Sequence, residues 1–321
     1  MDLRASNLVS TGLASNSRRA YSYAVSRYIS FCSRYSFDPF QLEELTVLRS
    51  IAYLESESSS ISPSTIRVYL AGIRAWLITN GIQVPLIYTQ RVKWALLSLD
   101  SKAPIPLRVC PFTIDMFRKV LGNILYSYDN VHLFSAMLLG YFGCLRAAEY
   151  CPSSGGPPPL LPSHCRFVDS DSPYFLIDIQ SSKTAVKGFT LVVGCSHSFI
   201  CAVCWLRRCL SIRVLPPHLP LFSFRSGAPI TRAALSSFMK DVLVRSGLDP
   251  SNISPHSLWG GSTTDAAGLG LPDSAIQRLG RWRSSAFRAY IRPSHSQLAL
   301  SAPLLASVQG HAPAPECTQH W

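Results

Sequence analysis

The chain has 321 residues, of which 47% are apolar and 15% are charged, and this composition excludes an intrinsically disordered protein. Its net charge of +12 is shared along the sequence, with +4 over residues 1–102 and +8 over the remainder. A basic surface on both parts favours a polyanionic partner, although charge alone leaves an ordinary basic protein possible. No apolar run reaches the roughly 18 residues of a membrane span, and no secretory signal is recognisable. We therefore expect an intracellular protein whose ten cysteines are not paired in disulfides.

The first hundred residues carry four patterns of helical periodicity. The clearest one follows Ser62, which can cap a helix whose first turn accepts Pro63. The four expected helices cover residues 13–36, about 41–57, 63–80 and about 88–99. Together they predict a small helical domain over residues 13–100, followed by a proline-punctuated linker over 101–112.

Basic side chains project from these four helices and are candidate phosphate contacts. They are Arg18, Arg19, Arg67, Arg74, Arg91 and Lys93. Each of them either holds a phosphate of a polyanionic partner or belongs to an ordinary solvated helix face, and the sequence of the domain by itself leaves both interpretations open.

A second domain, mainly helical with a small β-sheet, is expected over residues 113–296, with a tail over 297–321. Two runs rich in β-branched and aromatic residues, 174–180 and 189–193, flank the turn 181–188 and predict a β-hairpin. Helices are expected from Thr113 to about Leu121 and over 130–145, about 201–212, 232–245, 257–269 and 273–279. The architecture expected for the whole chain is therefore mainly α with a small sheet.

Several residues of this second domain are candidates for a functional site. Arg146 directly follows an almost wholly apolar helix, where a guanidinium group needs an acid or a bound anion, and Glu149 lies one turn further on, well placed to orient it. Lys183 occupies the tip of the expected hairpin. His256 opens a helix, and Tyr290 follows 34 residues later. A histidine at a helix start is more often a cap, and a tyrosine among aromatic residues is more often packing, but the order and spacing of the group favour one shared site.

From about residue 13 to 296 the sequence resembles a tyrosine recombinase of the phage-integrase superfamily, in versions carried by eukaryotic mobile elements. The resemblance rests on three motifs, Ser254-Pro-His-Ser-Leu-Trp-Gly-Gly-Ser-Thr-Thr-Asp-Ala-Ala-Gly268, Gly270-Leu-Pro-Asp273 and Ile276-Gln-Arg-Leu-Gly-Arg-Trp282. It implies a two-domain, C-shaped clamp on DNA, made of a helical core-binding domain and a catalytic domain.

The resemblance also implies roles for individual residues. Tyr290 matches the nucleophile that forms a 3′-phosphotyrosyl link to DNA. Arg146 matches an arginine that holds the non-bridging phosphate oxygens, and Lys183 matches the residue that donates a proton to the leaving oxygen. His256 matches a histidine that assists proton movement, and Trp282 stands where the family has histidine or tryptophan.

Because the phosphotyrosyl link conserves the energy of the broken bond, the resemblance implies no cofactor and no catalytic metal. The implied partners are double-stranded DNA and further copies of the chain, assembled as a tetramer on the DNA. With DNA as the implied partner, the six basic residues of the first domain become predicted DNA contacts, and Arg281, beside Trp282, is a seventh. A nuclear location follows only from the DNA role and the eukaryotic character of the resemblance.

One position departs from the family pattern. Where the motif has a second catalytic arginine, this sequence has Trp259, and no arginine lies between Arg245 and Arg278 to replace it. The loss of one positioned transition-state donor typically costs about a hundred- to a thousandfold in rate, or roughly 3–4 kcal/mol. Three functions therefore remain open: a recombinase with impaired cleavage, a DNA-binding protein that no longer cleaves, and a helical interaction protein without a nucleic-acid role.

Two further segments have alternative interpretations. Cys195, His197, Cys201 and Cys204 have the spacing of zinc ligands, but Cys204 fits equally well on the buried face of a helix. Residues 296–307 form an apolar segment that packs either on a neighbouring protomer or on its own chain.

Overall fold

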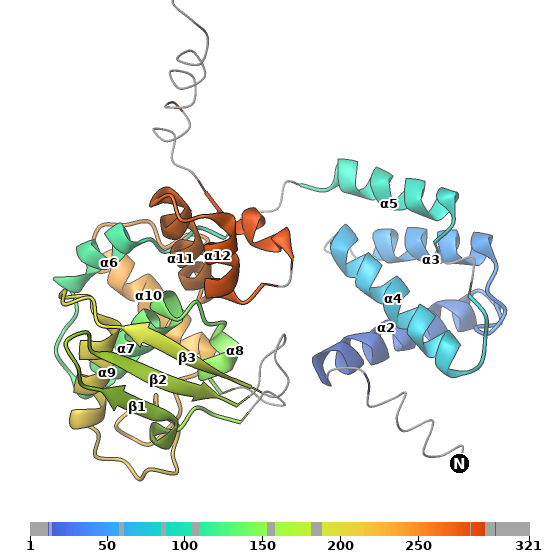
Figure 1. The fold of residues 1–321 in the computed structure, drawn as a ribbon. Coiled ribbons are helices and arrows are strands. Elements are labelled where there is room, and N and C mark those ends of the chain that lie inside the picture. Colours follow the sequence, from blue (N-terminus) through green and yellow to red (C-terminus); the bar gives the residue numbers. More distant parts are fainter. Residues whose placement is uncertain are drawn as a thin grey trace, which may run out of the picture. The chain divides into compact units, whose positions relative to one another are not determined.

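The computed structural model describes residues 15–57, 61–84, 88–104, 109–152, 158–180, 188–282 and 284–292, together with Gly12 and Ala299. The chain divides into two compact units, Met1–Leu107 and Arg108–Trp321 (Figure 1). In the described ranges no helix is long and apolar enough to cross a membrane. Lys183, and the segment 296–307 apart from Ala299, lie outside the described residues, so the predictions for them stay predictions.

The first unit is helical, as its sequence periodicity predicts. Its helices are α2 (Ser15–Arg34), α3 (Glu44–Glu57), α4 (Pro63–Thr79) and α5 (Gln90–Lys102). The start of α4 is the expected one, because the Ser62 side chain accepts a hydrogen bond from the Thr65 N–H and Pro63 occupies the first turn. The apolar faces of these helices form a separate core that includes Phe31, Leu70 and Leu77.

The second unit contains a three-stranded antiparallel sheet in the order β1-β2-β3. Its strands are β1 (Cys165–Val168), β2 (Tyr174–Ile179) and β3 (Phe189–Gly194). The expected hairpin pairs β2 with β3, with Phe175 opposite Val193. Along β2 the side chains of Phe175, Ile177 and Ile179 are buried in alternation, which matches the period of a strand with one face on the core. Strand β1 is an addition that the sequence pattern did not predict.

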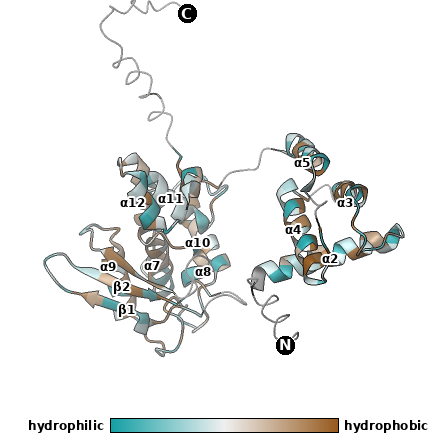
Figure 2. Cartoon of the chain, turned by 45° about the vertical axis from the view of Figure 1, so that its right-hand side comes forward, coloured by the Kyte–Doolittle hydropathy of each residue, from teal (hydrophilic) through white to brown (hydrophobic). Residues whose placement is uncertain are grey.

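Helices make up the rest of the second unit, so the mainly α fold with a small sheet is confirmed (Figure 1). They are α6 (Ile114–Leu121), α7 (Tyr128–Phe142), α8 (Ala147–Tyr150), α9 (Ala202–Ser211), α10 (Arg232–Arg245), α11 (His256–Gly268) and α12 (Asp273–Gly280), with 3₁₀ turns η2 (Pro162–His164) and η3 (Ser285–Tyr290). Helix α7 is buried from Val131 to Tyr141 and is largely brown in Figure 2, which identifies it as the central element of the core.

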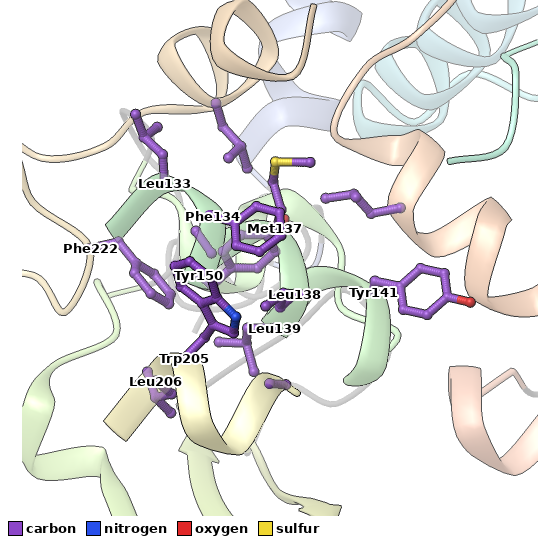
Figure 3. Packing of buried hydrophobic residues seen from close by; sticks show 14 of the residues in the cluster. Leu133, Phe134, Met137, Leu138, Leu139, Tyr141, Tyr150, Trp205, Leu206 and Phe222 are labelled. Atoms are coloured by element: carbon purple, nitrogen blue, oxygen red, sulfur yellow. The ribbon is translucent and has the colours of Figure 1, made fainter. Parts of the chain in front are cut away.

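The packing around α7 fixes the elements that lead to the candidate site. Trp205 of α9 meets Phe134 of α7 edge to face, with 4.6 Å between ring centroids, and both lie in the core cluster of Figure 3. The Ser135 hydroxyl donates a hydrogen bond to the Trp205 carbonyl across the same contact. The middle of α7 is therefore held in place by buried contacts on α9, about two turns before the end of the helix that leads to Arg146.

A single carboxylate joins three helices of this unit. The Asp265 Oδ2 atom of α11 accepts hydrogen bonds from the Ile114 N–H at 2.7 Å and from the Tyr141 hydroxyl at 2.5 Å. The Thr113 side chain, which the sequence predicts as the cap of α6, makes no capping hydrogen bond. The cap comes instead from a residue distant in sequence, and a negative charge is favourable at a helix amino terminus.

The segment before α6 lies directly against α11. The Phe112 N–H donates to the Ser257 carbonyl at 2.9 Å. Gly261 makes this approach possible, because a Cβ atom at that position would overlap the Phe112 carbonyl oxygen. The close contact brings Val109, Cys110 and Pro111 beside the start of α11, where they form one wall of the candidate site.

Candidate active site

Aromatic rings from three separate motifs meet at one end of α11. Trp259 stacks on Trp282 with 4.5 Å between ring centroids and an interplanar angle of 15°. Tyr290 lies 4.8 Å from the Trp259 ring and 5.2 Å from the His256 ring, measured between centroids. The structure therefore brings together the four aromatic positions that the sequence singled out.

The backbone after α12 turns sharply so that Trp282 can join this cluster. Arg281 adopts a left-handed conformation with φ of 56°, and Trp282 folds back over Gly280. A Cβ atom at Gly280 would overlap the indole ring of Trp282, so only glycine fits there without displacing the ring. The Gly280-Arg-Trp282 sequence thus determines where the tryptophan stacks.

Tyr290 ends the 3₁₀ turn η3, which is anchored on both sides. Phe287 is buried in a small cluster with Ala266 and Ile276, and the Thr264 hydroxyl donates to the Tyr290 carbonyl at 3.0 Å. Tyr290 lines a cavity of about 670 Å³. The other lining residues are Val109, Cys110, Pro111, His256, Ser257, Gly260, Arg288, Ala289, Ile291 and Arg292. Tyr290, the candidate nucleophile, and His256, the candidate proton acceptor, thus line the same cavity.

The His256 imidazole is held mainly in its neutral form. Burial lowers the pKa of His256, and the positive charges of Arg232 and Arg146 lower it further. A neutral imidazole has a free lone pair, so His256 is able to accept a proton at neutral pH.

Arg146 is oriented by the acid that the sequence predicts. Glu149, whose side chain is only 2% exposed, accepts hydrogen bonds from the Arg146 N–H at 2.9 Å and from Arg146 Nη1 at 3.3 Å. The Arg146 side chain remains 21% exposed, so its guanidinium keeps access to solvent. The buried Glu149 carboxylate therefore holds both the backbone at the start of α8 and the Arg146 guanidinium.

Arg281 shares this carboxylate, which the sequence did not indicate. Its Nη2 lies 3.4 Å from Glu149 Oε2 and donates to the Cys144 carbonyl at 2.7 Å, while Nη1 donates to the Gly143 carbonyl at 3.1 Å. Burial lowers the pKa of Arg281, whose side chain is 19% exposed and stacks over the Phe189 ring. Arg281, predicted as a DNA contact, therefore points its guanidinium toward the protein, where it donates hydrogen bonds to two carbonyls just after α7.

Trp259 occupies the middle of this arrangement. Its ring is 3% exposed, and the Arg146 guanidinium carbon lies 4.6 Å from the ring centroid. The indole N–H is buried and has no hydrogen-bond partner among the described residues. Where the resemblance leads us to expect a second cation, the site therefore presents an aromatic ring in contact with both Arg146 and Trp282.

Comparison with known proteins identifies the fold. No protein-family model and no curated protein matches the sequence. Among solved structures, XerH site-specific recombinase bound to difH substrate in a pre-cleavage complex matches with a TM-score of 0.59 at 14% identity, covering 89% of this chain and 79% of that one. A lambda integrase dimer bound to a COC′ core site matches with a TM-score of 0.58 at 15% identity, covering 90% and 93%. The fold is that of the tyrosine recombinases.

A third tyrosine recombinase structure agrees, the Tn1549 transposon integrase in complex with transposon right end DNA. It matches with a TM-score of 0.57 at 13% identity over 89% of this chain and 93% of that one. The tyrosine recombinase fold is thus common to three proteins that are each solved with DNA. At these identities the similarity concerns the fold, and the roles of single residues rest on the geometry above.

The basic residues predicted in the first unit of this tyrosine recombinase fold have different surroundings. Arg67 forms a two-pronged ion pair with Asp100 at 2.5 and 2.9 Å, and Arg91 pairs with Glu44 at 2.8 Å. Arg19 and Lys93 are exposed. Arg18 and Arg74 line a cavity of about 810 Å³ beside α2 and α4. Arg67 and Arg91 would have to leave an acid to contact a phosphate.

Proposed function

We propose that this chain is a DNA-binding protein of the tyrosine recombinase type, derived from a mobile element, whose strand cleavage through Tyr290 is impaired by Trp259. The observation that carries the proposal is the convergence of Tyr290, His256 and Arg146 around one aromatic ring. In that arrangement a nucleophile, a neutral base and a guanidinium surround a position where the second cation is replaced by an indole.

The proposed reaction is a transesterification at a DNA phosphodiester. The Tyr290 oxygen forms a bond to phosphorus while the bond from phosphorus to the 5′ oxygen breaks, which leaves a 3′-phosphotyrosyl link. His256 accepts the tyrosine proton, and its lowered pKa supports this role. Lys183 donates a proton to the departing 5′ oxygen, and Arg146, oriented by Glu149, contacts the non-bridging oxygens. Trp282 packs beside the tyrosine.

Trp259 reduces the electrostatic part of this catalysis. An indole ring offers no positive charge to the growing charge on phosphorus. The absence of one positioned donor corresponds to a loss of about a hundred- to a thousandfold in rate. DNA binding is affected less, because many basic groups share the phosphate contacts.

The proposed partners are double-stranded DNA and further copies of the chain. The similar recombinase and integrase structures are complexes with DNA, and the net charge of +12 supports the same partner here. We expect a tetramer on DNA and a nuclear location, consistent with an origin in a eukaryotic mobile element.

Covalent trapping on DNA of random sequence tests the proposal whatever site the protein recognises. The protein is incubated with nicked duplexes of randomised sequence, and covalent adducts are isolated under denaturing conditions and sequenced. We expect a weak adduct signal that disappears in Tyr290→Phe. An adduct that persists in Tyr290→Phe would contradict the assignment of the nucleophile.

The second candidate function is DNA binding without cleavage, and the close packing of Trp259 between Trp282 and Arg146 favours it. In this case the protein retains duplex DNA with a steep salt dependence, because phosphate contacts release counterions, but gives no adduct at all. If DNA retention is absent at low salt, both functions are excluded and the helical interaction protein remains.

A further inference from the structure

Three cysteine thiols meet between the sheet and helix α9, away from the candidate active site. Cys195 directly follows β3, Cys201 immediately precedes α9, and Cys204 lies in the first turn of that helix. Their Sγ atoms all lie within 4.8 Å of one another. The Cys195 sulfur is 3.4 Å from that of Cys201 and 3.9 Å from that of Cys204.

These separations match the edges of a tetrahedral metal site. A Zn–S bond of about 2.3 Å places two thiolates of a tetrahedron about 3.8 Å apart, and a Zn–N bond of about 2.0 Å places thiolate and imidazole about 3.5 Å apart. The His197 Nδ1 atom lies 3.7 Å from the Cys195 sulfur. Two of the three sulfur–sulfur separations are therefore already close to ligand distances, the third is within 4.8 Å, and an imidazole lies next to Cys195.

The packing of the helix does not explain this cluster. Cys204 is exposed, so its placement on a buried helix face, one of the two sequence interpretations, is wrong. Cys209, one and a half turns further along α9, does lie in the core and is fully buried. In addition the Ser196 N–H points at the Cys201 sulfur from 3.4 Å, a contact that favours a thiolate.

We propose that Cys195, Cys201, Cys204 and His197 bind one zinc ion as a structural site. The three thiolates come from within ten residues of the chain and supply three of the four tetrahedral positions. His197 supplies the fourth. It is exposed, and its Nδ1 lies near the Cys195 sulfur but not within 4.8 Å of all three sulfurs, so the imidazole has to rotate on metal binding.

The proposed zinc connects two elements on which the candidate active site depends. Strand β3 begins with Phe189, whose ring supports the Arg281 guanidinium. Helix α9 carries Trp205, which packs on Phe134 in the middle of α7, the helix that leads to Arg146. A metal ion that ties the end of β3 to the first turn of α9 holds the sheet against α7. The site is thus structural in kind, with all its positions filled by the protein.

Metal analysis of the full chain, produced without a polyhistidine tag, tests this proposal directly. We expect native mass spectrometry to show about one zinc per chain, and Co²⁺ exchange to give the absorption of a tetrahedral thiolate complex. Cys204→Ser, at an exposed position that tolerates the change, should lose the metal. Cys110→Ser, a cysteine outside the cluster, should keep it, and His197→Ala should bind zinc more weakly than the unaltered protein.

Two results would overturn the zinc site. One is a folded, unaltered protein that binds no zinc when zinc is supplied, whether its thiols alkylate freely or Cys195 and Cys201 are joined by a disulfide. The other is a Cys204→Ser variant with full zinc content. Neither result bears on DNA cleavage, so the zinc proposal and the proposed function fail independently.

Discussion

Replacing Trp259 by arginine restores a cation at the point where the Tyr290, His256 and Arg146 side chains converge. In the free protein this charge is unfavourable. Its guanidinium would replace a ring whose centroid is 4.6 Å from the Arg146 guanidinium carbon. At an effective dielectric constant of about 20, two like charges at that distance repel by about 3.6 kcal/mol.

Loss of the buried indole adds to this cost, since large aromatic truncations in a core typically cost about 3–5 kcal/mol, of which the arginine stem recovers a part. We therefore expect Trp259→Arg to lower the free energy of unfolding by at least about 4 kcal/mol without DNA. A bound phosphate between the two guanidinium groups removes the repulsion, so DNA should stabilise this variant more than the unaltered protein. Urea unfolding with and without duplex measures both quantities.

The same substitution should raise the rate of adduct formation by about a hundred- to a thousandfold, because a positioned charged donor is returned to the transition state. The assay is covalent trapping on nicked duplexes, with Tyr290→Phe added to Trp259→Arg as the control for the nucleophile. Trp259→Gln, which adds a shorter donor without charge, should recover less activity than Trp259→Arg. A folded Trp259→Arg protein that DNA stabilises but that forms adduct no faster than the unaltered chain would refute the reasoning.

The other predictions concern the frame around the site. Glu149→Gln should lower the free energy of unfolding by up to about 3 kcal/mol, because it leaves two half-buried guanidinium groups without their shared carboxylate; an unchanged urea midpoint would speak against this. Gly261→Ala should cost about 1–3 kcal/mol by forcing a methyl group onto backbone, whereas Gly260→Ala, where a Cβ meets nothing within 4 Å, should be neutral or stabilising in the same unfolding assay. Burial lowers the pKa of both His132 and His256, so the folded state binds fewer protons than the unfolded one and stability should fall as the pH drops below about 6.5. The slope is at most about 1.4 kcal/mol per pH unit for each histidine, and His132→Gln should reduce it; an equal slope in both proteins would exclude that source.

Helices with strong local sequence signals, such as a capping residue or a long apolar run, were predictable from the sequence. Helix α4 begins where Ser62 and Pro63 place it, because both signals act within one turn of the chain. The apolar run of α7 likewise predicts a buried central helix. The β2–β3 pairing was predictable because both strands are rich in β-branched and aromatic residues.

Elements that depend on distant partners were not predictable. Strand β1 has four residues and acquires its strand character by pairing with β2. The cap of α6 is supplied by Asp265 from α11 rather than by the adjacent Thr113, and no local signal carries that information. Short strands and tertiary caps are determined by the assembled core rather than by their own residues.

The candidate site likewise has residues that the sequence indicated and contacts that it did not. His256, Trp282 and Tyr290 were found from their order in the sequence, and the ring contacts among them agree with one shared site. The sequence did not show that Arg281 folds back onto Glu149, since this needs the left-handed turn after α12. The role of Lys183 stays a prediction.

If the chain acts on DNA as we propose, the Glu149 carboxylate between Arg146 and Arg281 has a consequence for which state of the DNA the site binds best. Two guanidinium groups against one carboxylate leave a single positive charge in that cluster. A phosphodiester in the ground state carries one negative charge, whereas the pentacovalent state at the top of the barrier carries two. An environment matched to the single charge favours intact DNA and lowers the barrier only a little, since acceleration requires tighter binding of the transition state than of the substrate. Trp259 thus leaves the charge of this cluster matched to intact DNA rather than to the transition state.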